Sequence, residues 1–543
     1  MNTRTRPATS PRRSTPRKAG KTARAPASKT AAKAEPKAPT QTVRKATAKA
    51  AAAAGRTALR KPARQPTGQS ADKAAANRTD RAGRQPAATR ARKPAASRAT
   101  APAATTQRPR GAARKPFDLV LFGATGFTGR QAVRAVLRQQ PDARWAVAGR
   151  DARRLQALLD EMLPRGTTAP KIIVADARDA ASLQAMARQT QVLFNLAGPY
   201  HATGDAVVAA CIGAGTHYLD LSAETFWMQR LVREQHAAAV RAGVKIMPCA
   251  GYEALPFDLA TLWAAHQLRQ QCGEACASVK ILVGITGRYL TRAHDLVSGG
   301  TAATVTELLE HDHTDCLQDM ACLLPPDADD AAGVARRNAL HWLPRYDADV
   351  QAVTAPTLPG PFINPPVVLR GVALMNDATL FDTAFRYQEG TNMASVLPGW
   401  LPARASLALQ WAAAAAVAAP LAHLGATVAG PLQFQRGLLG SVLQRVVPKQ
   451  GTGPSEAALD AIGYELQVFA RGASGARFRG RVVAKGHPGY RSTPEMAVSM
   501  ALGLADGTLG RTPHFGIVSP AAGLGIEAVP ALAAAGVSFT PGA

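Results

Sequence analysis

From residue 117 onward, short apolar runs alternate with segments whose apolar residues recur at helical spacing. The run FDLVLF (117–122) is continuous and apolar, which is typical of a buried parallel strand. The segment RQAVRAVLRQ (130–139) spaces its apolar residues for one face of a helix. Similar apolar runs predict five more strands, at 145–149, 171–176, 192–198, 216–221 and 244–249. The alternation therefore predicts an α/β fold with a Rossmann-type, doubly wound parallel sheet.

The N-terminal part of the chain has a different composition. Residues 1–115 contain 30 Lys and Arg against three acids, and so carry nearly all of the net charge of +28. They contain no Phe, Trp or Tyr. So few apolar side chains cannot offset the entropy of ordering the backbone, and we predict a disordered tail. The remaining residues have ample apolar content for a sizeable core.

The tail is also the candidate contact for polyanions. Its elements SPRR (10–13) and STPRK (14–18) resemble the basic elements of linker-histone tails. Dense cations on a flexible chain bind polyanions by releasing counterions, without reading bases. Two interpretations stay open: non-specific contact with nucleic acid or anionic lipid through 1–115, and an inert solvating extension.

The cysteines indicate a reducing compartment. All six follow residue 200, and the charged N-terminus lacks the apolar core of a secretory signal. We therefore expect unpaired thiols and a cytoplasmic location. Cys272 and Cys276 are four apart and could share a helical face; unpaired structural thiols are favoured there over a disulfide or a metal pair.

The turn GATGFTG (123–129) lies between the first predicted strand and helix, which is the context of a dinucleotide-binding turn. Gly123 permits the tight turn, Gly126 lets the backbone approach a pyrophosphate, and Gly129 lets the helix pack closely on the strand. Backbone N–H groups at the helix start face the phosphates. The residues predicted to bind the cofactor are Gly123, Thr125, Gly126, Phe127, Thr128, Gly129, Arg150, Arg153, Asp176, Asn195, Gly198 and Pro199.

The end of the second predicted strand favours NADP(H) over NAD(H). A site for NAD usually places Asp or Glu there to bind the ribose hydroxyls. This chain has Arg150 there and Arg153 one turn on, and a guanidinium suits a 2′-phosphate. Asp151 is adjacent and weakens this preference.

The strand ends also supply the candidate catalytic groups. Hydride transfer needs a nicotinamide against the substrate and a nearby proton donor. Residues 195–200 follow the fourth strand and are expected to border the nicotinamide. No tyrosine has a lysine four positions later, which excludes the short-chain dehydrogenase pair. The candidate donors are Tyr200, His201, Tyr252 and Asp258.

Several segments together resemble the saccharopine dehydrogenase-like oxidoreductases, most closely the trans-acting enoyl reductases of lipid polyketide assembly. They include FDLVLFGATGFTG, AVAGRDARRL, AGYEALPFDLA, SGGTAATVTEL and KGHPGYRSTPEMAVSMALGLADG. The resemblance spans about 116–543. It implies an NADP-binding Rossmann domain, expected over 116–265, and a second α+β domain with a mixed sheet over 266–543. It also implies an enzyme that reduces a small-molecule or carrier-bound acyl (enoyl) substrate, with a role in lipid or glycolipid synthesis.

The most apolar stretch, 405–430, is long enough to span a membrane, but Pro420 and His423 interrupt it. Three interpretations stay open: an interfacial or acyl-binding helix, a buried helix or oligomer contact, and a true span. The first would place the protein peripherally at the inner membrane surface. The second includes a homo-oligomer, if the helix is covered by another copy of the chain. The C-terminal segment is expected to pack back on the Rossmann domain.

Two polar segments allow further sites. The run SGGT (298–301) precedes a predicted helix, and it reads equally as an anion site and as a helix cap. The run EHDHTDC (310–316) gathers His311, His313 and Cys316. Positions two apart do not share a helix face, so a solvated helix end is favoured there and no metal is assigned.

A second function remains open beside the reductase. NmrA-like regulators share the GATGxxG turn, bind NADP and catalyse nothing. In that hypothesis the chain is an NADP-sensing regulatory protein whose basic tail binds nucleic acid. The polar groups at the strand ends favour the enzyme, because a pure sensor does not need them.

Overall fold

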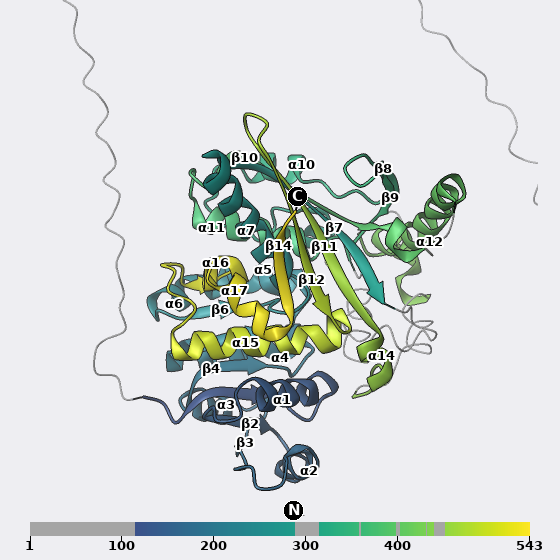
Figure 1. Cartoon of the computed structure of the whole chain (residues 1–543). Helices are drawn as coiled ribbons and strands as arrows, with labels where there is room; N and C mark the ends of the chain where they lie inside the picture. The colour runs from purple at the N-terminus through teal and green to yellow at the C-terminus, as the bar shows by residue number, and fades with distance from the viewer. Residues whose placement is uncertain are drawn as a thin grey trace, which may run out of the picture. The chain divides into compact units, whose positions relative to one another are not determined.

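The computed structural model divides the chain into two units, and the described residues lie in the unit formed by residues 98–543. Two seven-stranded sheets and the helices packed on them form this unit (Figure 1). The described residues are 114–287, 314–357, 360–397, 402–429, 432–438 and 451–542. The basic segment therefore lies outside the described residues apart from its last two positions.

The first sheet is parallel throughout and has the order β13-β6-β5-β4-β1-β2-β3, which confirms the predicted Rossmann-type fold. Its interior strand β1 is buried over its last four residues, as its continuous apolar sequence requires. The strands are β1 (Phe117–Phe122), β2 (Trp145–Gly149), β3 (Lys171–Val174), β4 (Thr190–Asn195), β5 (His217–Asp220), β6 (Lys245–Met247) and β13 (Gly516–Ile517).

Helices connect these strands in the order expected for a doubly wound sheet. They are α1 (Phe127–Gln139), α2 (Ala152–Met162), α3 (Ala180–Ala187), α4 (Tyr200–Ala214), α5 (Thr225–Glu234) and α6 (His236–Arg241). One further helix comes from the C-terminal part of the chain: α15 (Thr493–Asp506) packs against α1, β1 and β4 (Figure 1). With β13, this helix places C-terminal residues in the core of the first sheet.

The second sheet is mixed, with the order β14-β12-β11-β7-β10-β9-β8. Strands β7 and β10 pair in parallel, and the other neighbours pair antiparallel. Its strands are β7 (Cys276–Gly287), β8 (Arg345–Asp347), β9 (Ala352–Ala355), β10 (Phe381–Asn392), β11 (Ile462–Gly472), β12 (Arg477–Lys485) and β14 (Val537–Pro541).

Helix α7 (Leu255–Cys272) leads from the first sheet to the second and packs on β7, β11 and β12. Most of its side chains are buried, and Trp263 packs edge-to-face on Phe478 of β12. The other described helices are α9 (Thr314–Gln318), α10 (Ala331–Arg337), α11 (Asn364–Met375), α14 (Glu456–Ala461), α16 (Pro520–Leu524) and α17 (Ala528–Ala531), with the short turns η2 (Met393–Val396), η3 (Gln433–Gln435), η4 (Pro488–Ser492) and η5 (Leu532–Ala535).

The apolar stretch forms one long helix, α12 (Ala403–Ala429), which contains Pro420. Within it 406–427 is the one span of the described residues that is long and apolar enough to cross a membrane, with a mean hydropathy of 1.5. Ala414 and Leu421 on one face are buried. Leu409 and Trp411 remain 45% and 43% exposed. The helix thus packs on the protein by one face only.

Two expectations about cysteines need correction. Cys272 and Cys276 do not share a helical face, because α7 ends at Cys272, Gly273 turns in the left-handed region, and Cys276 opens β7. Cys316 is buried in α9 rather than solvated at a helix end. His311 and His313 lie outside the described residues, as does the run at 298–301. All six thiols are unpaired.

Candidate functional site

The glycine turn joins β1 to α1 and has no space for side chains at two of its three glycines. A Cβ at Gly123 would lie 2.8 Å from the backbone N of Ala197, and its φ of +90° favours glycine. A Cβ at Gly129 would lie 2.4 Å from the carbonyl oxygen of Gly123. A Cβ at Gly126 would meet only that same oxygen, at 3.3 Å. Gly123 and Gly129 therefore close the turn, while Gly126 leaves its surface clear.

Helix α1 begins at Phe127 and receives no side-chain cap from Gly126. Backbone N–H groups in an uncapped first turn are the groups that bind a pyrophosphate. The ring of Phe127 packs edge-to-face on Tyr490, with ring centroids 5.7 Å apart, so its part in a phosphate site is limited to its backbone. Thr125 and Thr128 are half-buried beside it. The turn fits a dinucleotide.

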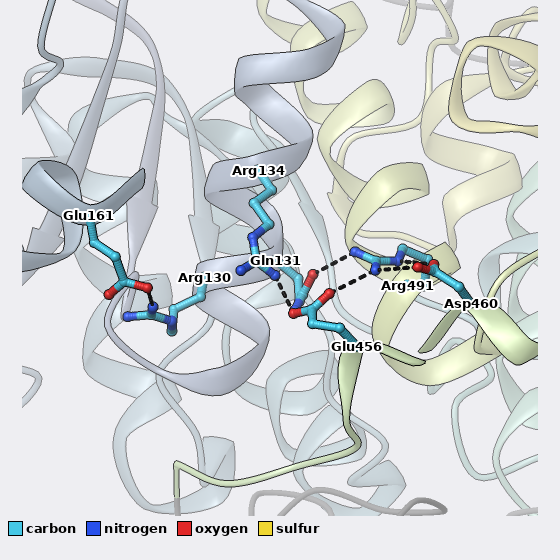
Figure 2. Close-up of polar contacts among 7 residues, drawn as sticks. All are labelled: Arg130, Gln131, Arg134, Glu161, Glu456, Asp460 and Arg491. Atoms are coloured by element: carbon cyan, nitrogen blue, oxygen red, sulfur yellow. Dashed lines mark hydrogen bonds and ion pairs between the residues drawn. The ribbon is translucent and has the colours of Figure 1, made fainter. Parts of the chain in front are cut away.

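Polar side chains anchor α1 on two sides (Figure 2). Arg130 pairs with Glu161 of α2 on one side. On the other, Arg491 of η4 donates to Gln131 at 3.0 Å and to Glu456 of α14 at 2.8 Å. Gln131 in turn donates to Glu456, which is 325 positions away in the chain. The nucleotide-binding helix is thus fixed by the C-terminal part of the chain.

The end of β2 presents an arginine and turns its neighbouring carboxylate away. Arg150 is exposed. Asp151 caps α2 instead, because its Oδ1 accepts from the backbone N–H groups of Arg153 and Arg154 at 3.0 and 3.1 Å. A carboxylate used in this way is less available to ribose hydroxyls. Asp151 therefore weakens the preference for NADP(H) less than its position in the sequence indicates, and the Arg150 guanidinium suits a 2′-phosphate.

Two other predicted cofactor residues have their side chains engaged within the protein. Asp176, just beyond β3, accepts from the N–H of Arg178 at 2.9 Å in a local turn. Asn195 ends β4 fully buried; its Nδ2 donates to the hydroxyl of Tyr218 and its Oδ1 accepts from the N–H of Ala197. Asn195 therefore shapes the strand end from inside.

Gly198 and Pro199 lead from β4 into α4, which starts at Tyr200. Glu224, which is fully buried, accepts from the N–H groups of Tyr200 and His201 at 3.1 and 2.7 Å. It therefore satisfies the first turn of the helix. The same carboxylate lies 2.9 Å from Nδ1 of His201.

The Tyr200 hydroxyl lies between two strand ends of the first sheet. It donates to the carbonyl oxygen of Asn195 at 3.3 Å and accepts from the N–H of Leu221 at 3.4 Å. Burial, and then the nearby carboxylate of Asp220, raises the pKa of Tyr200 well above its ordinary value. The ring stacks on Trp227, with centroids 5.7 Å apart. These contacts describe a residue that fixes the strand ends.

The other two candidate donors lie after β6. The ring of Tyr252 packs edge-to-face on Phe257 and Tyr464. Asp258 is buried in α7, and its Oδ2 accepts from the N–H of Ala521 at the start of α16, at 2.7 Å. Burial raises the pKa of Asp258 to about 7. Asp258 thus joins α7 to α16.

Two acidic residues that no sequence motif singles out lie at the junction of the two sheets. Glu253 lies in the loop after β6 and Glu389 on β10, and both are half-buried. Burial is the largest cause that raises the pKa of Glu253 to about 7 and of Glu389 to about 8. The Glu253 carboxylate adds to the shift of Glu389. Only the fold brings them together, since 136 positions separate them in the sequence.

Comparisons with known proteins agree with this geometry. The family described as saccharopine dehydrogenase NADP binding domain matches residues 119–247. A Mycobacterium tuberculosis protein with the provisional name trans-acting enoyl reductase is 31% identical, over 79% of this chain and 98% of that protein. The trans-acting enoyl reductase of Mycobacterium leprae is 30% identical, over 78% of this chain and 97% of that protein.

A solved structure also resembles the chain. It is a saccharopine dehydrogenase (L-Glu forming) from Saccharomyces cerevisiae, with 15% identity and a TM-score of 0.40. The likeness covers 78% of this chain and 99% of that one.

Proposed function

Because the chain belongs to the saccharopine dehydrogenase-like oxidoreductases, in the trans-acting enoyl reductase subgroup, and is an NADP(H)-dependent enzyme, we propose that it reduces an enoyl group on an acyl substrate. The substrate is a small molecule or a carrier-bound acyl chain. The reaction belongs to lipid or glycolipid synthesis. The names of the relatives support the enoyl chemistry, and the nucleotide site supports the cofactor.

The observation that carries the cofactor half of the proposal is the pair formed by the glycine turn and the end of β2. In the proposal the first turn of α1 binds the pyrophosphate, and Gly126 lets the backbone approach it. Arg150, with Arg153 nearby, binds the 2′-phosphate. Gly198 and Pro199 border the nicotinamide at the end of β4. When bound, NADPH supplies a hydride to the substrate.

In this proposal the four candidate donors predicted from the sequence position the site and do not donate the proton; they are Tyr200, His201, Tyr252 and Asp258. Tyr200 and His201 hold the strand ends and the start of α4 through their hydrogen bonds. Tyr252 packs between aromatic rings, and Asp258 holds α16. Such contacts fix the walls of the site where the substrate meets the nicotinamide.

The cofactor assignment is tested by titrating the full chain with NADPH and NADH. A lost charge-assisted contact costs about 1.5–3 kcal/mol, so Arg150→Ala should weaken NADPH binding by roughly 10- to 100-fold. NADH binding should change little. Arg233→Ala, at an exposed arginine of α5, is the matched control and should leave both affinities unchanged. Equal weakening of both cofactors by Arg150→Ala would contradict a 2′-phosphate contact.

The substrate assignment needs a second measurement. Oxidation of NADPH should be followed with a panel of enoyl, keto and imine compounds, including enoyl thioesters of increasing chain length. We expect turnover with the enoyl thioesters. Turnover confined to keto or imine compounds would reject the enoyl assignment and leave the oxidoreductase intact.

The location is also part of the proposal. We place the enzyme in the cytoplasm, with peripheral contact at the inner membrane surface through the exposed face of α12, where Leu409 and Trp411 lie. An acyl substrate would favour such contact. Flotation of the full chain with liposomes tests it, because a protein without membrane affinity stays at the bottom of the gradient.

A further inference from the structure

Glu389 has the best-defined polar surroundings among the half-buried acids at the junction of the two sheets. The hydroxyl of Tyr387, two positions earlier on β10, donates to its Oε2 at 2.8 Å. Nδ2 of Asn364, the first residue of α11, donates to its Oε1 at 3.3 Å. Tyr387 and Asn364 are themselves 2% and 1% exposed. Two buried donors on separate elements thus orient a carboxyl group that keeps part of its own surface accessible.

Asn364 adds an independent sign of a ligand. Its Oδ1 is buried and has no hydrogen-bond partner among the described residues. A buried acceptor without a donor destabilises the fold, and so such atoms are rare unless something else satisfies them. A ligand with an N–H or O–H group beside Glu389 would supply that donor.

Burial, and after it the charge of a neighbouring carboxylate, keeps a proton on Glu389. The titratable groups that face Glu389 are Glu253 and Tyr252 from the loop after β6, and Tyr387 from its own strand; the side chains of Asn364 and Thr357 also lie beside it. Asp258 lies near Tyr387. Burial and repulsion from Glu253 raise the pKa of Glu389 to about 8, so it is largely protonated at neutral pH. An acid with a pKa near the working pH is the most effective proton donor.

We infer that Glu389 is the proton donor of the reduction, held by Tyr387 and Asn364 at the junction of the two sheets. The inference rests on the proposed enoyl reduction. Hydride addition to the β-carbon of the enoyl group leaves an electron pair on the α-carbon. That pair takes the proton of the Glu389 carboxyl group, whose O–H bond breaks as a C–H bond forms. The acyl chain leaves saturated, and water returns a proton to the Glu389 carboxylate.

The main test is Glu389→Gln in the full chain, assayed with NADPH and the enoyl thioester that the wild-type enzyme reduces. Loss of a general acid lowers kcat by about 100-fold or more, whereas NADPH affinity should be unchanged. The wild-type rate should fall as the pH rises through about 8, since the acid must be protonated. The variant should lose this pH dependence. Glu234→Gln, at an exposed glutamate of α5, is the matched control.

Two further measurements test whether Glu389 carries a proton and whether that proton takes part in the reaction. The infrared band of protonated carboxyl groups at neutral pH should be weaker in Glu389→Gln than in the wild type, with no substrate needed. Tyr387→Phe removes a donor that favours the anion, so the alkaline limb of the rate profile should move to higher pH. A protonated residue with a structural role alone would change the infrared band but would leave the alkaline limb of the rate profile where it is in Tyr387→Phe.

The outcomes separate this inference from the proposed function. Normal turnover of Glu389→Gln, or an unchanged infrared band, overturns the inference alone. Failure of the wild-type chain to reduce any enoyl thioester overturns the proposed function, and the inference with it. A variant that does not fold is replaced by Tyr387→Phe, whose unshifted pH limb would also overturn the inference.

Discussion

Gly126 and Gly129 stand three positions apart in one turn, and their surroundings predict different effects of the same substitution. A methyl group at position 129 would press on the carbonyl oxygen of Gly123 at 2.4 Å, so α1 must move away from β1. Gly129→Ala should therefore lower the free energy of unfolding by about 1–3 kcal/mol and also weaken NADPH binding. Urea denaturation and NADPH titration measure the two effects.

Gly126→Ala is the comparison within the same turn. Its methyl group meets only one protein atom at 3.3 Å, so the free energy of unfolding should change by less than about 1 kcal/mol. NADPH binding should still weaken, because the methyl group occupies the surface where a pyrophosphate would approach. Equal losses of stability in the two variants would contradict the assignment of close packing to Gly129 and of cofactor approach to Gly126.

For single residues, the sequence indicates which residues belong to the site better than it indicates which partners they contact. The turn glycines are predictable because their spacing within seven residues is itself the pattern of a dinucleotide-binding turn, although the atoms that crowd Gly123 belong to the distant Leu196 and Ala197. Asn195 ends β4, whereas Asp258 lies in the first turn of α7, and their side chains bond to Tyr218 and Ala521. Local spacing carries no information about such distant partners.

Among the elements, α12 offers a test of how its apolar residues are used. Ala414 is fully buried against Val353, Ala355 and Met393, whereas the neighbouring Ala415 is exposed. Ala414→Leu should cost about 1–3 kcal/mol of stability through overpacking. Ala415→Leu adds the same volume toward solvent and should cost almost nothing. Thermal unfolding of the two full-length variants checks this, and equal midpoints would contradict the packing of α12 on the second sheet.

The elements that periodicity could not predict are those formed by distant pairing. Six strands of the first sheet are predicted from apolar runs in the sequence. The seventh, β13, contains only two residues and pairs with β6 through Gly516 and Lys245. A segment of two residues is too short to show the alternation of apolar and polar positions from which a strand is predicted. Helix α15 reads as an ordinary apolar helix, and only the fold shows that it packs on β1 and β4.

For the whole molecule, buried acids at the junction of the two sheets make stability depend on pH in an unusual direction. Burial raises the pKa of Asp258 to about 7, above its ordinary value of 3.8. Between about pH 4 and pH 7 the folded chain therefore holds a proton that the unfolded chain has released. The free energy of unfolding contributed by this group is greatest below that window and falls as the pH rises through it, by up to about 1.4 kcal/mol per pH unit.

Asp258→Asn should remove this dependence while it keeps the bond to the N–H of Ala521, because the amide oxygen can accept it. Urea denaturation at several pH values between 4 and 8 should show a less negative slope of stability against pH in the variant than in the wild type. Asp349→Asn is the control: Lys280 lowers the pKa of that carboxyl group, so its own titration lies below the window. Parallel slopes for Asp258→Asn and the wild type would mean that Asp258 releases its proton in the folded protein. The junction would then hold a buried charge, and Asp258 could not share with Glu253 and Glu389 the preference for the protonated state on which proton donation depends.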